Sequence, residues 1–169
     1  TINAAPRIGD VTLTQQLTGA GDQTVDNLMH YDEYGNVISV SVFPEYGIKG
    51  ESHSGAGYET VIEYDAGLRT YPVKKTNPLG YETITGYLFE LGLPSQTTDP
   101  NGWTTLTTYD GLGRTLSITP PGLGQPGVYY TYPTVQPGMG RLEAPYSVEM
   151  QILDTAVMPI QYRSVWGIY

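Results

Sequence analysis

The chain has 169 residues, with 15 Tyr, 21 Gly, 13 Pro and no Cys, and its formal net charge is -9. The lack of cysteine excludes thiol nucleophiles, disulfides and cysteine metal sites. The acidic excess repels phosphate backbones and anionic lipids, so the expected partners include no nucleic acid. No run of about 18 apolar residues occurs, which predicts no membrane insertion.

The first predicted strand covers residues 10–17, where apolar and polar side chains partly alternate. Residues 18–22 contain two glycines and predict a loop before a second strand that ends at Tyr31. The first strand has no earlier partner of its own. Residues 1–24 are therefore interpreted as part of a preceding repeat and a loop.

Tyrosine residues mark a recurring strand end. The anchors are Tyr31, Tyr64, Tyr87 and Tyr109, at intervals of 33, 23 and 22 residues. An aliphatic residue lies three positions before each anchor, and Val or an aromatic residue lies six positions before: Leu28, Val61, Ile84 and Leu106, then Val25, Tyr58, Tyr81 and Trp103. The longest interval holds a glycine-rich insertion at residues 46–57. Such a period predicts stacked supersecondary units, here four hairpins over residues 25–122.

The last copy shows the hairpin most clearly. Residues 103–109 are rich in Thr and aromatic residues, as in a strand. The turn follows at residues 110–113, because Asp110 can bond its own backbone and Gly113 can adopt positive φ. Residues 114–119 form the return strand, and Pro120-Pro121-Gly122 ends it.

The region after residue 122 fits the repeat poorly. Residues 123–140 are rich in Pro and Gly around a short predicted strand at 128–132. Residues 147–153 and 161–169 predict two more strands, with a loop at 154–159 between them. We interpret residues 123–169 as a Pro- and Gly-rich passage with degenerate strands, truncated before the next repeat.

The pattern predicts an all-β fold of stacked β-hairpins, a solenoid-like strip with two open edges. Trp103 and Tyr109 fall on one strand face and Leu106 on the other, so both faces carry apolar residues. A two-sided pattern of this kind favours a sheet with neither face freely solvated.

The Tyr-Asp turns resemble the YD-repeat, or Rhs-repeat, family. The copies at residues 31–36 and 109–114 follow the family pattern of Tyr-Asp, Gly and then Asn or Arg, and Asp99-Pro100-Asn101-Gly102 is similar to the family's punctuation. The copy at residues 64–69 has its glycine one place early, and the copy at residues 87–92 lacks the Asp. The resemblance thus covers residues 25–122, with two good copies and two degraded ones.

The resemblance implies a non-catalytic structural role. Proteins of this family build β-strips that spiral into hollow shells, which enclose a variable C-terminal toxin in bacterial toxin complexes and Rhs effectors and support adhesion in teneurins. The implied partners are neighbouring repeats, an enclosed toxin domain, or a surface glycan or protein, and the implied location is secreted or cell-surface. The residues that carry the structural motif are Tyr31, Asp32, Gly35, Asn36, Tyr64, Asp65, Arg69, Tyr87, Tyr109, Asp110, Gly113 and Arg114. No segment matches the aspartate autoprotease of toxin-bearing members.

The alternative is an extracellular module that binds carbohydrate or protein through exposed aromatic faces, with a sugar stacked on Trp103 or Tyr81. Repeated spacing favours cross-strand packing as the role of the tyrosines. Asp32, Asp65 and Asp110 could ligate a metal, but Asp-initiated turns explain them, so no metal or cofactor is expected.

Catalytic arrangements are few. His30 is interpreted as a sheet-face residue. His53 lies within residues 50–55, which predict a flexible, exposed loop, so a Ser-His pair there lacks a fixed geometry. Asp99 and Asp110 could form an acid-base pair, but turn chemistry accounts for both. The sequence therefore predicts no catalytic residues.

Overall fold

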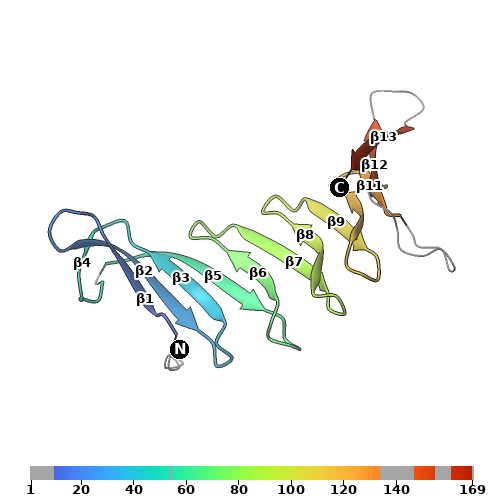
Figure 1. Cartoon of the computed structure of the whole chain (residues 1–169). Helices are drawn as coiled ribbons and strands as arrows, with labels where there is room; N and C mark the ends of the chain where they lie inside the picture. Colours follow the sequence, from blue (N-terminus) through green and yellow to red (C-terminus); the bar gives the residue numbers. More distant parts are fainter. Residues whose placement is uncertain (1–9, 54, 134–146, 155–160, 169) are drawn as a thin grey trace, which may run out of the picture. The chain divides into compact units, whose positions relative to one another are not determined.

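A computed structural model describes residues 10–53, 55–133, 147–154 and 161–168 (Figure 1). Every regular element in these ranges is a β-strand, and neighbouring strands pair antiparallel in the order of the sequence, apart from the short β4. The all-β fold of consecutive hairpins is confirmed. The chain divides into two units, one up to residue 85 and one from residue 86 onward.

The first unit contains a meander of hairpins in the order β1-β2-β3-β5-β6-β7, and β7 continues into the second unit. The strands are β1 (Leu13–Leu17), β2 (Gln23–Tyr31), β3 (Val37–Val42), β4 (Gly47–Ile48), β5 (Tyr58–Tyr64), β6 (Pro72–Thr76) and β7 (Glu82–Leu88). β3 pairs with the second half of β2, whereas β4 pairs with Gln23 and Thr24 at its start. Part of the predicted insertion is therefore a strand of the sheet.

The second unit continues the same topology. Its strands are β8 (Leu93–Thr98), β9 (Thr104–Tyr109), β10 (Thr115–Thr119), β11 (Val128–Thr131), β12 (Ser147–Asp154) and β13 (Gln161–Ile168). The predicted loop at 154–159 is wrong at its first residue, because Asp154 pairs with Gln161 at the end of β12. Residues 155–160, 134–140 and Tyr169 lie outside the described ranges.

Three Tyr-Asp turns share one irregularity of register. In each hairpin, the anchor tyrosine and the residue before it pair with two residues of the return strand that are separated by one unpaired residue. The unpaired residues are Ile38 in β3, Val73 in β6 and Leu116 in β10. A β-bulge of this kind bends the strand and increases its twist. The hairpins that turn at Asn77 and Asp99 pair without a register shift. The two turn classes therefore shape the sheet differently.

Little apolar surface is buried. Among the described residues Phe43 is the one buried apolar side chain, whereas Val61, Ile84 and Tyr58 are exposed. Stability must therefore come from hydrogen-bonded hairpins and cross-strand pairs, summed over repeats, rather than from a central core.

Candidate functional site

The Tyr-Asp turns use the aspartate as an internal acceptor. Asp110 Oδ1 accepts hydrogen bonds from the backbone N–H groups of Leu112 and Arg114, both at 2.9 Å. Asp110 Oδ2 accepts from Nε of Arg114 at 2.6 Å, and Gly113 has a φ of 78°. The backbone N–H of Arg114, and then its side chain, hold the pKa of Asp110 below its usual value against the effect of burial. The carboxylate thus closes the turn as an anion.

The first Tyr-Asp turn repeats this geometry with different side chains. Asp32 Oδ1 accepts from the backbone of Tyr34 and Asn36, and Oδ2 accepts from Nδ2 of Asn36 at 2.9 Å. Gly35 supplies the positive φ, 87°. Although burial acts to raise it, the hydrogen bonds from Asn36 and its neighbours lower the pKa of Asp32. The residue after the glycine can therefore be Arg or Asn, because the side chain of either can donate a hydrogen bond to the turn carboxylate.

Two turns that the sequence reading did not place in this class use the same acceptor pattern. Asn77 Oδ1 accepts from the backbone of Leu79 and Tyr81. Asp99 Oδ1 accepts from the backbone of Asn101 and Trp103. The shared signal, Asn or Asp, then Pro, any residue, Gly and an aromatic residue, was present in the sequence. Along the meander, the Asn77 turn follows the Asp65 turn, and the Asp99 turn precedes the Asp110 turn.

Asp99 and Asp110 do not form an acid-base pair, since they close separate turns at the two ends of β9. The pKa of each is lowered, first by a backbone N–H of its own turn, from Trp103 and from Arg114 respectively. A general acid at neutral pH needs a raised pKa. Neither carboxyl group meets that requirement.

The Asp65 turn is longer because its glycine comes early. Asp65 accepts from the backbone N–H groups of Leu68, Thr70 and Tyr71. Led by the Tyr71 N–H, these bonds lower the pKa of Asp65 to about 2. The left-handed position falls on Arg69, with a φ of 54°, which is the one non-glycine residue of positive φ in the described ranges. Such a conformation costs on the order of 1 kcal/mol or more.

Three of the four anchor tyrosines bond a backbone carbonyl of the preceding strand or of the residues just before it. The hydroxyl of Tyr31 donates to the Val11 carbonyl at 2.7 Å, and that of Tyr109 donates to the Pro94 carbonyl at 2.7 Å. Tyr64 donates to the Val37 carbonyl at 3.2 Å. Burial raises the pKa of Tyr87, the fourth anchor. Here the tyrosines act in packing and hydrogen bonding between neighbouring strands.

One contact joins two of the turns directly. Nδ2 of Asn36 donates to the backbone carbonyl of Arg69 at 2.7 Å, so the first and second Tyr-Asp turns lie side by side at one edge of the first unit (Figure 1). Asn36 thus bonds both to its own turn aspartate and to the next turn.

The insertion contains a buried polar cluster, and here the sequence expectation for His53 is wrong. The His53 side chain is 6% exposed, and its ring stacks on Phe43 with the centroids 4.0 Å apart. Its Nδ1 lies 3.2 Å from Oδ2 of Asp26, a side chain with no exposed surface. The glycines and serines of this segment predict a flexible loop. The contact that fixes His53 is with Asp26, 27 residues earlier in the chain, and the local sequence does not reveal it.

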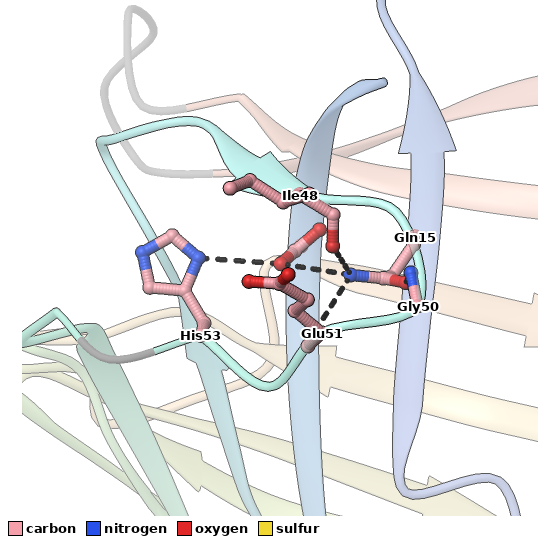
Figure 2. Close-up of polar contacts among 6 residues, drawn as sticks. Gln15, Ile48, Gly50, Glu51 and His53 are labelled. Atoms are coloured by element: carbon pink, nitrogen blue, oxygen red, sulfur yellow. Dashed lines mark hydrogen bonds and ion pairs between the residues drawn. The ribbon is translucent and has the colours of Figure 1, made fainter.

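Gln15 holds the other side of this cluster (Figure 2). Its Nε2 lies within hydrogen-bond distance of Asp26 Oδ2 at 3.2 Å, and of the carbonyls of Ile48 and Glu51, both at 3.1 Å. Its Oε1 accepts from the backbone N–H of Gly50 at 2.8 Å. A side chain from β1 therefore fixes the insertion against β2.

Asp26 is an anion surrounded mainly by neutral donors. The Thr24 hydroxyl lowers its pKa, burial opposes this, and Gln15 and His53 lower it further. Within the described residues, neither Asp26 Oδ1 nor Thr24 Oγ1 has a hydrogen-bond partner of good geometry. A Cβ added at Gly47 would overlap Asp26 Oδ2. The cluster therefore requires glycine at residue 47.

The His53–Asp26 pair orients an imidazole, as catalytic dyads do, but orientation alone is not catalysis. In the part of the chain described, no hydroxyl is hydrogen-bonded to the other ring nitrogen. Of the two serines within residues 50–55, Ser54 lies outside the described residues. The contacts present hold the insertion in place and assemble no nucleophile.

Within residues 10–53, 55–133, 147–154 and 161–168, no three His, Asp or Glu side chains gather as they do around a metal ion. The same residues include no helix long and apolar enough to span a membrane.

The comparison with protein families gives one match. The model described as RHS Repeat matches residues 90–122, which cover β8, β9 and β10 with the Asp99 and Asp110 turns. No curated protein matches the chain. The matched stretch includes one turn of each class described above.

Proposed function

We propose that the chain, whose residues 90–122 match the RHS Repeat model, is part of a YD-repeat, or Rhs-repeat, protein and forms a wall segment of a large secreted or cell-surface protein. The chain is a structural repeat segment. In the proposed assembly its β-strip joins neighbouring repeats of the same polypeptide into a shell, which encloses a C-terminal toxin or supports adhesion.

The observation that carries the proposal is the use of the motif residues. The carboxylates of Asp32, Asp65 and Asp110 are occupied by backbone N–H groups of their own turns. The hydroxyl of Tyr31 donates to the Val11 carbonyl just before β1, and that of Tyr109 donates to the Pro94 carbonyl in β8. Because these side chains already bond within turns and between strands, their contacts favour a structural wall segment over a catalytic site.

The proposal is tested by the intact mass of the natural polypeptide that contains this sequence, with peptide mapping beyond residue 169. We expect a mass many tens of kilodaltons above 18.5 kDa, with further Tyr-Asp repeats in the flanking peptides. A natural product of 18.5 kDa would contradict the wall proposal.

Exposed aromatic residues favour a second candidate, a module that binds glycans or proteins. Tyr81 and Trp103 are 56% and 57% exposed. A ring with an open face can stack on a sugar. A glycan array probed with the 169-residue chain and with Trp103→Ala tests this; absence of binding by the parent chain would remove the candidate.

A further inference from the structure

A small cavity of about 140 Å³ lies in the insertion of the first unit, beside β4. Glu45, Glu51 and His53 line this insertion cavity, and Gly47 and Gly55 form part of its wall. Most of its lining surface is polar, and no lysine or arginine of the described residues contributes to it. The insertion cavity is therefore an acidic pocket in the segment that β1 and β2 hold in place.

His53 presents one ring nitrogen to the insertion cavity in a fixed position. Its Nδ1 lies 3.2 Å from Asp26 Oδ2, and its ring stacks on Phe43. Because the Asp26 carboxylate is an anion and can only accept a hydrogen bond, Nδ1 carries the proton, and Nε2 of the neutral ring is an acceptor. The His53 side chain is 6% exposed, and Nε2 has no partner within the described residues. A nearly buried side chain thus offers an acceptor that lacks a donor.

Glu45 brings a second acceptor to the same place. The position that a Cβ would occupy at Gly55 is 3.1 Å from His53 Nε2 and 3.5 Å from Glu45 Oε2. No ion pair joins Glu45 to His53 in the described residues, so the two atoms lie near one point without contacting each other. Glu45 is exposed, and its carboxylate has no other partner there. The two acceptors can therefore share one donor group placed between them.

The spacing of the two acceptors distinguishes a donor group from a metal ion. A nitrogen that donates to both at about 2.9 Å, with tetrahedral geometry, holds them about 4.7 Å apart. A tetrahedral metal ion binds imidazole nitrogen and carboxylate oxygen at about 2.1 Å and brings them to about 3.4 Å, which is ion-pair distance. Glu45 and His53 are not that close, and no three ligating side chains gather in the described residues. The spacing favours a hydrogen-bond donor.

The charge of the insertion cavity narrows the donor to a cation. Glu45 and Glu51 place carboxylates in its lining, and the Asp26 anion lies behind the imidazole. These charges oppose an anionic ligand. A primary ammonium combines one positive charge with three N–H donors. Because one water takes about 30 Å³ of liquid volume, the cavity has room for an ammonium group and a short alkyl stem.

From these observations we propose that the insertion cavity binds a primary alkylammonium group, carried by a small amine or by a lysine side chain. The ammonium donates to Nε2 of His53 and to the carboxylate of Glu45, and Glu51 adds negative charge to the lining. Asp26 is a positioning residue, since it acts through His53. The site belongs to the insertion rather than to the repeat hairpins and does not depend on the wall proposal.

The test is an NMR titration of the 169-residue chain with propylammonium and with Nα-acetyl-lysine amide, and with tetramethylammonium as a cation that has no N–H donor. We expect saturable binding of the primary ammonium compounds, with shifts at His53 and Gly55, and no saturable binding of tetramethylammonium. Binding of the lysine derivative alone supports a lysine side chain as the ligand, and binding of propylammonium alone supports a small amine. Absence of saturable binding by both overturns the proposal. Equal binding of tetramethylammonium also overturns it, since the site would then recognise charge alone.

Two variants separate binding from folding. In Gly55→Ala the new methyl group fills the space between the two acceptors, so saturable binding should be lost. Glu45→Gln removes the charge of an exposed side chain and should weaken the affinity about threefold, with an unchanged unfolding temperature. Gly124→Ala, whose Cβ meets nothing within 4 Å, and Glu90→Gln, at an exposed residue outside the cavity, are the matched controls and should change neither property. Unchanged affinity in either cavity variant contradicts the proposal.

Discussion

In the first repeat and in the RHS repeat at residues 90–122, the position five residues before the anchor tyrosine has different roles. Five residues before the anchor tyrosine, the first repeat has Asp26, without exposed surface and covered by the insertion. At the corresponding position of the RHS repeat, Thr104 is half-buried and bonds Thr98 across the hairpin at 2.9 Å. One position is the centre of a three-element cluster, whereas the other is an ordinary cross-strand pair.

The comparison shows that the repeat needs only local chemistry, while the insertion needs long-range contacts. In the RHS repeat, Asp99 and Asp110 close their turns within four residues. In the first repeat, Gln15 and His53 reach Asp26 from 11 and 27 residues away. Damage to the insertion should therefore spread over β1, β2 and β4, whereas damage to a turn should stay local.

The largest expected effect comes from Asp26→Ala. It leaves the ring nitrogen of the buried His53 without its acceptor and removes one of the three acceptors near Gln15 Nε2, which together cost about 3 kcal/mol of unfolding free energy. Thr104→Ala, the matched change, removes one hydrogen bond and should cost about 1 kcal/mol. Urea unfolding of both variants gives the two values. Equal losses would mean that the insertion adds no stability of its own.

Gly47→Ala should have the next largest effect. The new Cβ meets the buried Asp26 carboxylate and the Thr24 hydroxyl, and overpacking of this kind costs about 1–3 kcal/mol. Gly111→Ala is the control in the RHS repeat, because a Cβ there meets nothing within 4 Å. That control should change the free energy by less than about 0.5 kcal/mol. A tolerated Gly47→Ala would show that the cluster is loosely packed.

Tyr109→Phe should cost about 1 kcal/mol, because it removes the hydrogen bond to the Pro94 carbonyl and keeps the ring. Tyr58→Phe is the control, since Tyr58 is 60% exposed and its hydroxyl has no partner in the described residues. Thermal unfolding of the two variants compares them. A loss as large for Tyr58 as for Tyr109 would argue against the anchoring role.

A further prediction concerns pH and the Asp65 turn. The folded pKa of about 2 is below the usual 3.8, so the charged carboxylate stabilises the fold above pH 3.8 and this contribution is lost as the pH falls toward 2. The stability difference between the parent chain and Asp65→Asn should shrink over that interval, followed by thermal unfolding at several pH values. A difference independent of pH would contradict the assigned cause.

The repeat could be predicted from the sequence because its determinants are local. Tyr109, Asp110 and Gly113 sit at fixed offsets, and turn chemistry depends on such offsets. The cluster could not be predicted, because the contact between Asp26 and His53 depends on how the insertion folds back onto β2. The bulge at Leu116 was also missed, since strand alternation alone does not reveal an extra residue.

Hydrogen exchange of the parent chain and Asp26→Asn, followed by mass spectrometry, tests the central claim most directly. The account predicts faster exchange at residues 13–28 and in the insertion, where Gly50 donates to Gln15, with unchanged exchange at residues 90–122. Equal loss of protection in both regions, or none in the insertion, would contradict the division between a self-sufficient repeat and a cluster-dependent insertion.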